Sequence, residues 1–197
     1  MDTAERAGKV WTAEEFLATD QSEFGDAWRY ELVDGRIVAH AAPTPEHAAI
    51  ISGLTTALGT RLRGSRDGCR PEAGSGAAPR NQQRSTARIP DATIRCGDLP
   101  RVVFEVVSPS ELRKWRARDR KRRDLQGVEG VREIVEIYQD ELAVHVYRRE
   151  ADGNWSFNAV GGADAVLRLP SVGLEVPLAE IYEFATPREP DDESGES

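Results

Sequence analysis

The sequence predicts a mixed α/β domain, in which a β-sheet is flanked by helices. Three observations support this prediction. Residues 46–63 repeat an apolar side chain at about every fourth position, which is typical of one face of a helix. Residues 101–107 form an almost unbroken apolar run, as expected for a strand buried on both faces. Asp34-Gly35 lies between two apolar-rich runs, which is a strong signal for a β-hairpin.

The first half of the chain contains a helix start and the predicted hairpin. Thr12 and Glu15 form a capping-box pattern, so a short helix is expected to begin there. Gly64 is a suitable end for the long helix. Strands are expected at 28–33 and 36–40, followed by this helix at 46–63. Residues 64–88 are expected to form a loop with one or two irregular strands.

The second half reads as strands around one more helix. Ser108-Pro109-Ser110 ends the apolar strand, and Ser110 is the expected N-cap of a helix over 111–126. Gly127 or Gly130 would end that helix. The strands are expected at 91–95, 101–107, 132–139, 142–149, 155–160 and 165–169, and a last helix at 178–184.

The composition fits one domain without a membrane segment. With 197 residues, we expect a domain over 11–185, a flexible N-terminus at 1–10 and an acidic disordered tail at 186–197. No apolar run is long enough to span a bilayer, and the N-terminus lacks the apolar core of a secretory signal. The two cysteines are too few for a disulfide scaffold, so we expect reduced thiols in a cytoplasmic protein.

Basic residues gather in one stretch although the net charge of the chain is −8. A solvated helix usually mixes charges of both signs, whereas residues 113–123 would repel one another unless they met an anion. The alternative is pairing with the protein's own acidic surface. We expect Trp115 to anchor the helix to the core, with base stacking as its alternative role. The residues expected to bind nucleic acid are Arg113, Lys114, Arg116, Arg120, Arg122 and Arg123.

Two carboxylates are candidate metal ligands. Asp91 begins a predicted strand, and Glu105 lies inside an apolar one, where an unpaired charge is costly. On adjacent strands they could share a cleft and hold Mg²⁺ or Mn²⁺ with the main-chain carbonyl of Val106, while Glu31 assists. Each has an ordinary alternative. Asp91 could be a turn residue, Glu105 could pair with an arginine, and Glu31 could lie on the solvent face of its strand.

The order of several short motifs resembles the Uma-two endonuclease family of the PD-(D/E)xK superfamily. The resemblance covers about Trp11 to Tyr182 and implies a restriction-endonuclease-like α/β fold, a divalent metal and a nucleic-acid substrate. The matching segments are Tyr30-Glu-Leu-Val-Asp-Gly35, Pro43-Thr-Pro-Glu-His47, Pro90-Asp91 and Glu105-Val-Val-Ser-Pro-Ser110.

The resemblance also implies residue roles. Asp91 matches the motif aspartate, Glu105 the second acid, and Glu31 the acid near the N-terminus. The usual lysine two residues after the second acid is absent, since Val107 stands there. A lysine on the following helix matches best at Lys121, with Leu125 in place of an aromatic residue, and a one-residue shift would select Arg122 instead. A lysine in this role orients water and neutralises developing phosphate charge.

Two functions are therefore carried forward. The first is a magnesium-dependent endonuclease acting on DNA, with Asp91 and Glu105 as metal ligands, Glu31 assisting and Lys121 positioning water. The second is a catalytically degenerate nuclease fold that binds nucleic acid or a protein partner. The sequence carries no closely spaced histidine pair for a zinc hydrolase and no glycine-rich phosphate loop. A homodimer is expected, because two cuts need two sites.

Overall fold

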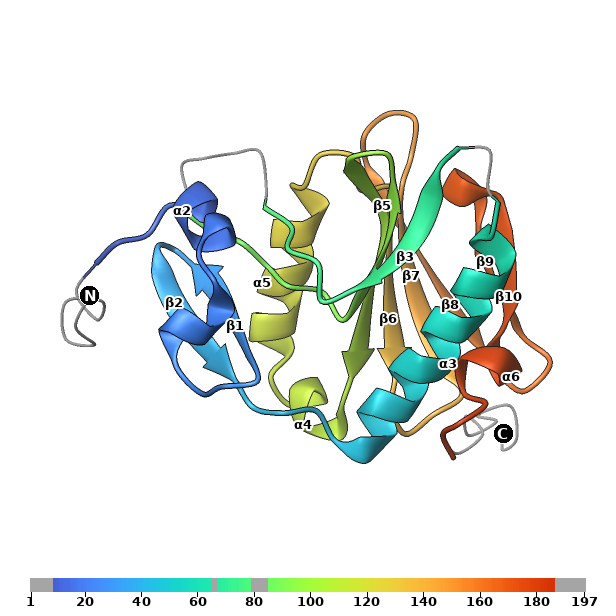
Figure 1. Cartoon of the computed structure of the whole chain (residues 1–197). Coiled ribbons are helices and arrows are strands. Elements are labelled where there is room, and N and C mark those ends of the chain that lie inside the picture. Colours follow the sequence, from blue (N-terminus) through green and yellow to red (C-terminus); the bar gives the residue numbers. More distant parts are fainter. Residues whose placement is uncertain (1–8, 65–66, 79–84, 187–197) are drawn as a thin grey trace.

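The computed structural model describes residues 9–64, 67–78 and 85–186, and its centre is a six-stranded mixed sheet (Figure 1). The strand order is β3-β4-β5-β6-β7-β8. Only β5 and β6 run parallel, and the other neighbours are antiparallel. The strands are β3 (Cys69–Ala73), β4 (Ala92–Cys96), β5 (Leu99–Val107), β6 (Glu133–Tyr138), β7 (Ala143–Arg149) and β8 (Trp155–Gly161). The predicted mixed α/β sheet flanked by helices is confirmed.

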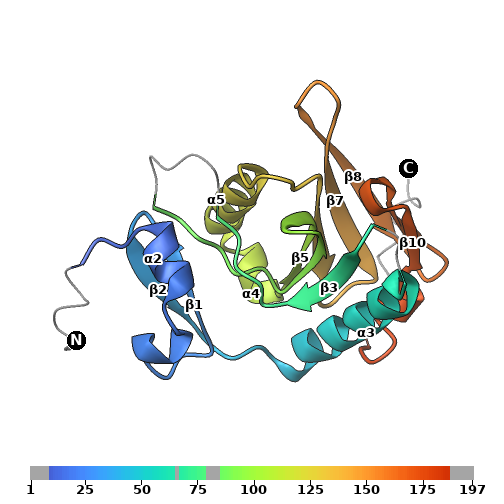
Figure 2. The ribbon, with the colours of Figure 1, turned by 45° about the horizontal axis from the view of Figure 1, so that its top comes forward.

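One face of the sheet packs against the long helix α3 (Pro45–Leu62), which Figure 2 shows running beneath the strands. Its apolar side chains Ile50, Leu54 and Leu58 belong to the largest core cluster, together with Phe104 from β5. The strand pair β9 (Val166–Leu169) and β10 (Leu174–Pro177), the short helix α6 (Leu178–Ile181) and the turn η2 (Pro170–Val172) cover the rest of this face. In the described part of the chain, no helix is both long and apolar enough to cross a membrane.

The opposite face carries helix α5 (Trp115–Gln126) and, beyond it, a separate hairpin (Figure 1). Leu125 of α5 packs on Val103 and Ile134, on the sheet face that also bears Glu105. The hairpin has its own small core with α2 and η1. These elements are β1 (Arg29–Val33), β2 (Arg36–His40), α2 (Ala13–Ala18) and η1 (Gln21–Phe24). This arrangement leaves a space lined by charged side chains between α5, the hairpin and the sheet.

The predicted helix over 111–126 is wrong in one respect, because the structure divides it. Helix α4 (Pro109–Leu112) begins after the N-cap Ser108, not Ser110, and Glu111 completes a capping box with Ser108. Lys114, with φ −101° and ψ 41°, leaves the helical conformation before α5 starts. Helix α4 therefore spans about one turn, and α5 starts as a separate helix at Trp115.

The remaining sequence predictions differ mainly at their ends. The Asp34-Gly35 hairpin is confirmed, with both residues at positive φ. Strand β3 lies within residues 64–88, where one or two irregular strands were predicted, and β10, a four-residue strand that ends at Pro177, was not predicted. The last helix ends at Ile181, earlier than predicted. Most of the predicted flexible N-terminus and nearly all of the predicted acidic tail lie outside the described residues.

The expectation of two reduced cysteines is wrong, because Cys69 and Cys96 form a disulfide. They are direct partners in the register of the antiparallel pair β3–β4, with Cα atoms 4.0 Å apart. Nothing in the sequence fixes this register, so the sequence does not indicate that the two cysteines are neighbours. Since disulfides persist mainly in oxidising compartments, the cytoplasmic location stays a prediction.

Reduction of this disulfide should destabilise the protein. The bridge closes a loop with a sequence separation of 27 residues. A loop of this length corresponds to about 3.5 kcal/mol of unfolding free energy, because the bridge restricts the unfolded chain. Urea unfolding with and without reductant, and of the Cys69→Ser/Cys96→Ser variant, measures the loss. Quantitative alkylation of both thiols in the unreduced native protein would contradict the bridge.

Candidate active site

A row of titratable side chains crosses the sheet on the face below α5. Glu105 of β5 lies opposite Glu136 of β6, which in turn lies opposite His145 of β7. Ala92 pairs with Phe104, so Asp91 immediately before β4 continues the row beside Glu105. Directly opposed residues share one face of a sheet. The two predicted acids are therefore on one face, as the adjacent-strand interpretation expects.

Glu105 is a largely buried carboxyl group with one hydrogen-bonded oxygen. Its Oε2 lies 2.8 Å from the ammonium of Lys121, whereas its buried Oε1 has no hydrogen-bond partner among the described residues. Burial raises the pKa of Glu105 to about 8. Asp91 and Glu31 add to this rise, and Lys121 opposes it. The partner of Glu105 is thus a lysine, not the arginine considered as an alternative.

Glu31 is fully buried and not on a solvent face. Its carboxylate receives Arg88 at 2.9 Å, Lys121 at 3.1 Å and the backbone N–H of Ile89 at 3.1 Å. Burial would raise the pKa of Glu31, but Lys121, His40 and Arg88 together lower it well below its ordinary value. Glu31 therefore stays ionised and ties the hairpin to the lysine of α5.

Asp91 is held by three donors. Arg29 lies 2.7 Å from its Oδ1 and His47 3.4 Å from the same atom, while Oδ2 accepts a hydrogen bond of 2.9 Å from the N–H of Val106. Burial works against the charge, yet His47, Lys121 and Arg29 lower the pKa of Asp91 well below its usual range. Val106 thus contacts Asp91 through its backbone N–H. That the carbonyl of Val106 serves as a metal ligand stays a prediction.

Lys121 and Arg122 point in different directions, as neighbours on a helix must. Lys121 reaches Glu105 and Glu31. Arg122 donates to Glu136 and to the hydroxyl of Tyr147, pairs with Asp119 on its own helix, and lies over the Tyr147 ring. Of these two neighbours, Lys121 is therefore the one that contacts Glu105 and Glu31.

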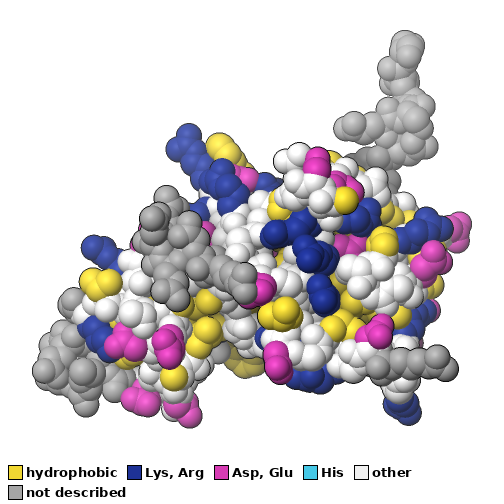
Figure 3. All heavy atoms as spheres, turned by 90° about the horizontal axis from the view of Figure 1, so that it is seen from above, with side chains coloured by type: hydrophobic (Ala, Val, Ile, Leu, Met, Phe, Trp, Pro, Cys, Tyr) yellow, Lys and Arg dark blue, Asp and Glu magenta, His cyan; other side chains and the backbone are white. Residues whose placement is uncertain are grey.

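The residues predicted to bind nucleic acid do not form one uniform surface. Arg122 points inward, Arg120 pairs with Asp34, and Arg123 pairs with Asp119. Arg113, Lys114 and Arg116 are exposed near the start of α5. Figure 3, which views the molecule from above, shows basic and acidic side chains interspersed.

The predicted core role of Trp115 is wrong, because 58% of it is exposed and Arg116 lies 5.3 Å from its ring. The separate helix α4 carries the chain onto the sheet, so Trp115 in the first turn of α5 is not needed as an anchor. The exposed ring is therefore free to take part in contacts outside the core.

Sequence reasoning missed two arginines that complete the site. Arg29 precedes Glu31 by two residues on β1 and so shares its face, which was an available signal. Arg88 joins Glu31 to Asp124 of α5. Its role depends on the path of the chain before Asp91, which no local pattern reveals. A cavity of about 220 Å³ lies among these groups, lined by Arg29, Glu31, Glu105, Lys121 and Glu136.

Comparison with known proteins agrees with this fold. The Uma2 family, described as "Putative restriction endonuclease", matches residues 13–179. The chain belongs to the Uma2 family. The crystal structure of a "putative nuclease belonging to DUF820" from Anabaena variabilis ATCC 29413 superposes with a TM-score of 0.67 at 18% identity, and the match covers 88% of this chain and 98% of that one. No curated protein matches the chain.

The Uma2 match spans the segment that contains Asp91, Glu105 and Lys121. Within residues 9–64, 67–78 and 85–186, no group of three or more His, Cys, Asp or Glu side chains is arranged to hold a metal ion. The site instead offers two carboxylates side by side. Magnesium commonly binds through one or two carboxylates and completes its shell with water and substrate phosphate.

Proposed function

We propose that this Uma2 protein is a divalent-metal-dependent endonuclease that hydrolyses phosphodiester bonds in DNA. The observation that supports this most directly is the ammonium of Lys121, which lies 2.8 Å from Glu105 on the sheet face shared with Asp91. Two acids and a lysine at one point supply a metal site and a fixed positive charge. These are the elements needed to hold and cleave a phosphodiester.

Asp91 and Glu105 are the residues that would hold Mg²⁺ or Mn²⁺, with the carbonyl of Val106 as a further ligand. The unpartnered buried Oε1 of Glu105 supports the fit, because an acceptor without a partner is costly to bury. Burial raises the pKa of Glu105, and Asp91 and Glu31 add to this rise, so a bound cation would stabilise the ionised carboxylate. When bound, the cation would supply Lewis-acid activation of water and phosphate.

The chain's own residues then perform the remaining tasks. Lys121 orients the attacking water and neutralises charge that develops on the phosphate. Glu31 holds that ammonium at 3.1 Å and keeps it protonated; although burial disfavours the charge, Glu105, Glu31 and Asp91 raise the pKa of Lys121. Arg29 lies 2.7 Å from Asp91 and can donate to a phosphate oxygen at the same place.

A nuclease assay with and without Mg²⁺ or Mn²⁺ tests the proposal. We expect metal-dependent cleavage of DNA by the parent protein. Asp91→Asn and Glu105→Gln should each reduce it by more than about 100-fold, since even outer partners of a metal ligand cost about 10–100-fold. Glu175→Gln changes an exposed acid far from the cleft and should cleave normally. Metal-independent cleavage, or full activity of both acid variants, would refute the site.

A second function, binding without turnover, is supported by the pairing of Asp91 with Arg29 and His47 and by Val107 at the usual lysine position. On this alternative the protein binds nucleic acid through the exposed basic residues of α4–α5, or binds a protein partner. It predicts DNA retention without product in the same assay. For the enzyme, we also propose a homodimer, because two cuts need two sites.

A further inference from the structure

A second cavity opens on the other side of Asp91. It has a volume of about 490 Å³ and lies between the hairpin, the start of α3 and strand β3. Arg29 lines both this cavity and the smaller one that contains Glu105 and Lys121. The two cavities therefore adjoin at Arg29, which lies 2.7 Å from Asp91. The volume falls within the range of about 300–1,000 Å³ that is usual for small-molecule sites.

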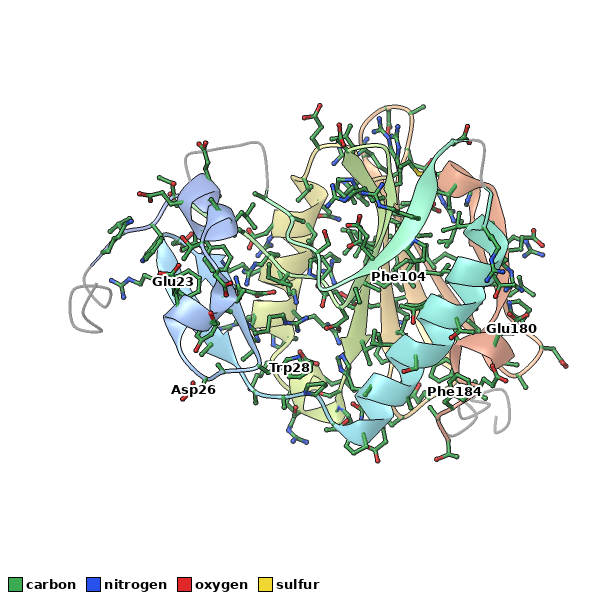
Figure 4. The ribbon with its side chains drawn as sticks, viewed as in Figure 1. Glu23, Asp26, Trp28, Phe104, Glu180 and Phe184 are labelled. Carbon is green, nitrogen blue, oxygen red and sulfur yellow. A yellow bond between two sulfur atoms is a disulfide. The ribbon has the colours of Figure 1, made fainter. Side chains whose placement is uncertain are left out.

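The walls of this cavity are mainly apolar, and one of them is an exposed aromatic ring. Trp28 is 66% exposed although it lines the cavity. Figure 4 places it between the hairpin and the lower end of α3. Ile51 and Ile89 line the same cavity, and Gln21 and Ser52 add polar groups. A planar polar ring suits such a space, since its faces can stack and its edge can form hydrogen bonds.

The charged groups of the cavity lie at one end. Arg29 and His47 contact Asp91 there. The Nε of Arg29 is buried and has no hydrogen-bond acceptor among the described residues. An arginine donor without a partner is suited to a phosphate oxygen, which accepts such bonds strongly. The cavity thus combines a phosphate donor at one end with an aromatic face in its wall.

We propose that this cavity receives one unpaired nucleobase of the substrate strand, stacked on Trp28, with the adjoining phosphate at Arg29. The position of that phosphate beside the cleaved bond rests on the proposed nuclease function. A base held in a duplex cannot enter a side cavity unless it is unpaired and rotated out. The preferred substrate is therefore single-stranded or locally unpaired nucleic acid.

The test is binding of a short single-stranded DNA oligonucleotide carrying 2-aminopurine, followed by fluorescence without divalent metal so that no cleavage occurs. Trp28→Ala should weaken binding by about 5- to 150-fold, the loss expected for one stacked base. It should also abolish the quenching of 2-aminopurine. Trp28→Phe should restore most of both. Phe184→Ala removes another exposed ring (55%), which Figure 4 places beside α6 and which does not line this cavity, and should bind like the parent.

Two further probes separate the possible occupants. The fully paired duplex of the same sequence should bind Trp28→Ala and the parent equally. A nucleoside monophosphate should bind far more weakly than the oligonucleotide. An equal loss on the duplex, or binding of the monophosphate as tight as that of the oligonucleotide, would overturn the proposal.

Failure of this site and failure of the nuclease function remain distinguishable. Unchanged single-strand affinity in Trp28→Ala, in a parent protein that cleaves DNA, would remove the base site alone. A parent that never cleaves but loses single-strand binding in Trp28→Ala would retain the base site and lose the enzyme. A thermal melt of each variant, unchanged from the parent, establishes that the effects arise in the folded protein.

Discussion

Replacing Lys121 by methionine should reduce metal-dependent DNA cleavage by about 10²–10³-fold, the usual cost of removing one fixed charge donor from a reaction centre. Methionine keeps the length of the side chain but removes the ammonium 2.8 Å from Glu105. Turnover under saturating DNA and metal measures the effect. DNA affinity should change little, because one buried ammonium contributes little to the contacts along a nucleic-acid backbone.

Arg122→Met is the matched control, since it removes the neighbouring positive charge. Arg122 contacts Glu136 and Tyr147 and does not reach Glu105. We expect its catalytic rate to remain near the parent value, with a loss confined to stability. Lys121→Arg adds a second comparison: it keeps the charge but replaces a compact ammonium by a planar fork, so activity should stay low. A normal rate in Lys121→Met with a defect in Arg122→Met would reverse the assignment.

The Lys121 variant should still fold. Glu105 loses its ion-pair partner within the described part of the chain, but its pKa is already raised to about 8, so it can accept a proton near neutral pH. Glu31 loses one contact and keeps Arg88 at 2.9 Å. A cleavage defect in Lys121→Met can therefore be assigned to chemistry once the thermal melt is measured.

The acid pair could be anticipated from sequence because strand alternation is a local property. A carboxylate inside an apolar strand is costly to bury unless it is paired or binds a metal. A second carboxylate at the start of the preceding strand lies beside it if the two strands pair. The choice between Lys121 and Arg122 could not be made this way. Their directions differ by about 100°, and the division of the helix at Lys114 changes where each turn begins.

Partners that are distant in sequence were missed for a related reason. Cys69 and Cys96 meet only through the register of β3 and β4, which no turn signal fixes. Arg88 acts between Glu31 and Asp124, which come from a hairpin and a helix far apart in the chain. Apolar periodicity reports which side of an element is buried, but it does not say which polar groups meet inside. The mixed sheet was therefore predictable, and its internal ion pairs were not.

Arg88→Met should be among the most destabilising single changes in the protein. The guanidinium of Arg88 lies 2.9 Å from Glu31 and 2.7 Å from Asp124, and little of it is exposed. Its pKa is raised by these two acids, although burial works in the opposite direction. Removing one member of a buried ion pair costs about 3–5 kcal/mol, because the remaining charge stays buried without compensation.

The loss of stability should be largest where three segments of the chain meet. Glu31 belongs to β1, Asp124 to α5, and residue 88 to the segment that leads to Asp91, so the arginine fastens the hairpin to the domain. Arg168→Met is the matched control, since its ion pair with Glu175 is mostly exposed (68% and 65%) and should change stability by no more than about 1 kcal/mol. Urea unfolding of both variants measures the difference. An Arg88→Met protein as stable as the Arg168→Met protein would mean that the hairpin is held by its apolar contacts alone, and the ion pairs of Arg88 would then serve only to orient Glu31 toward Lys121.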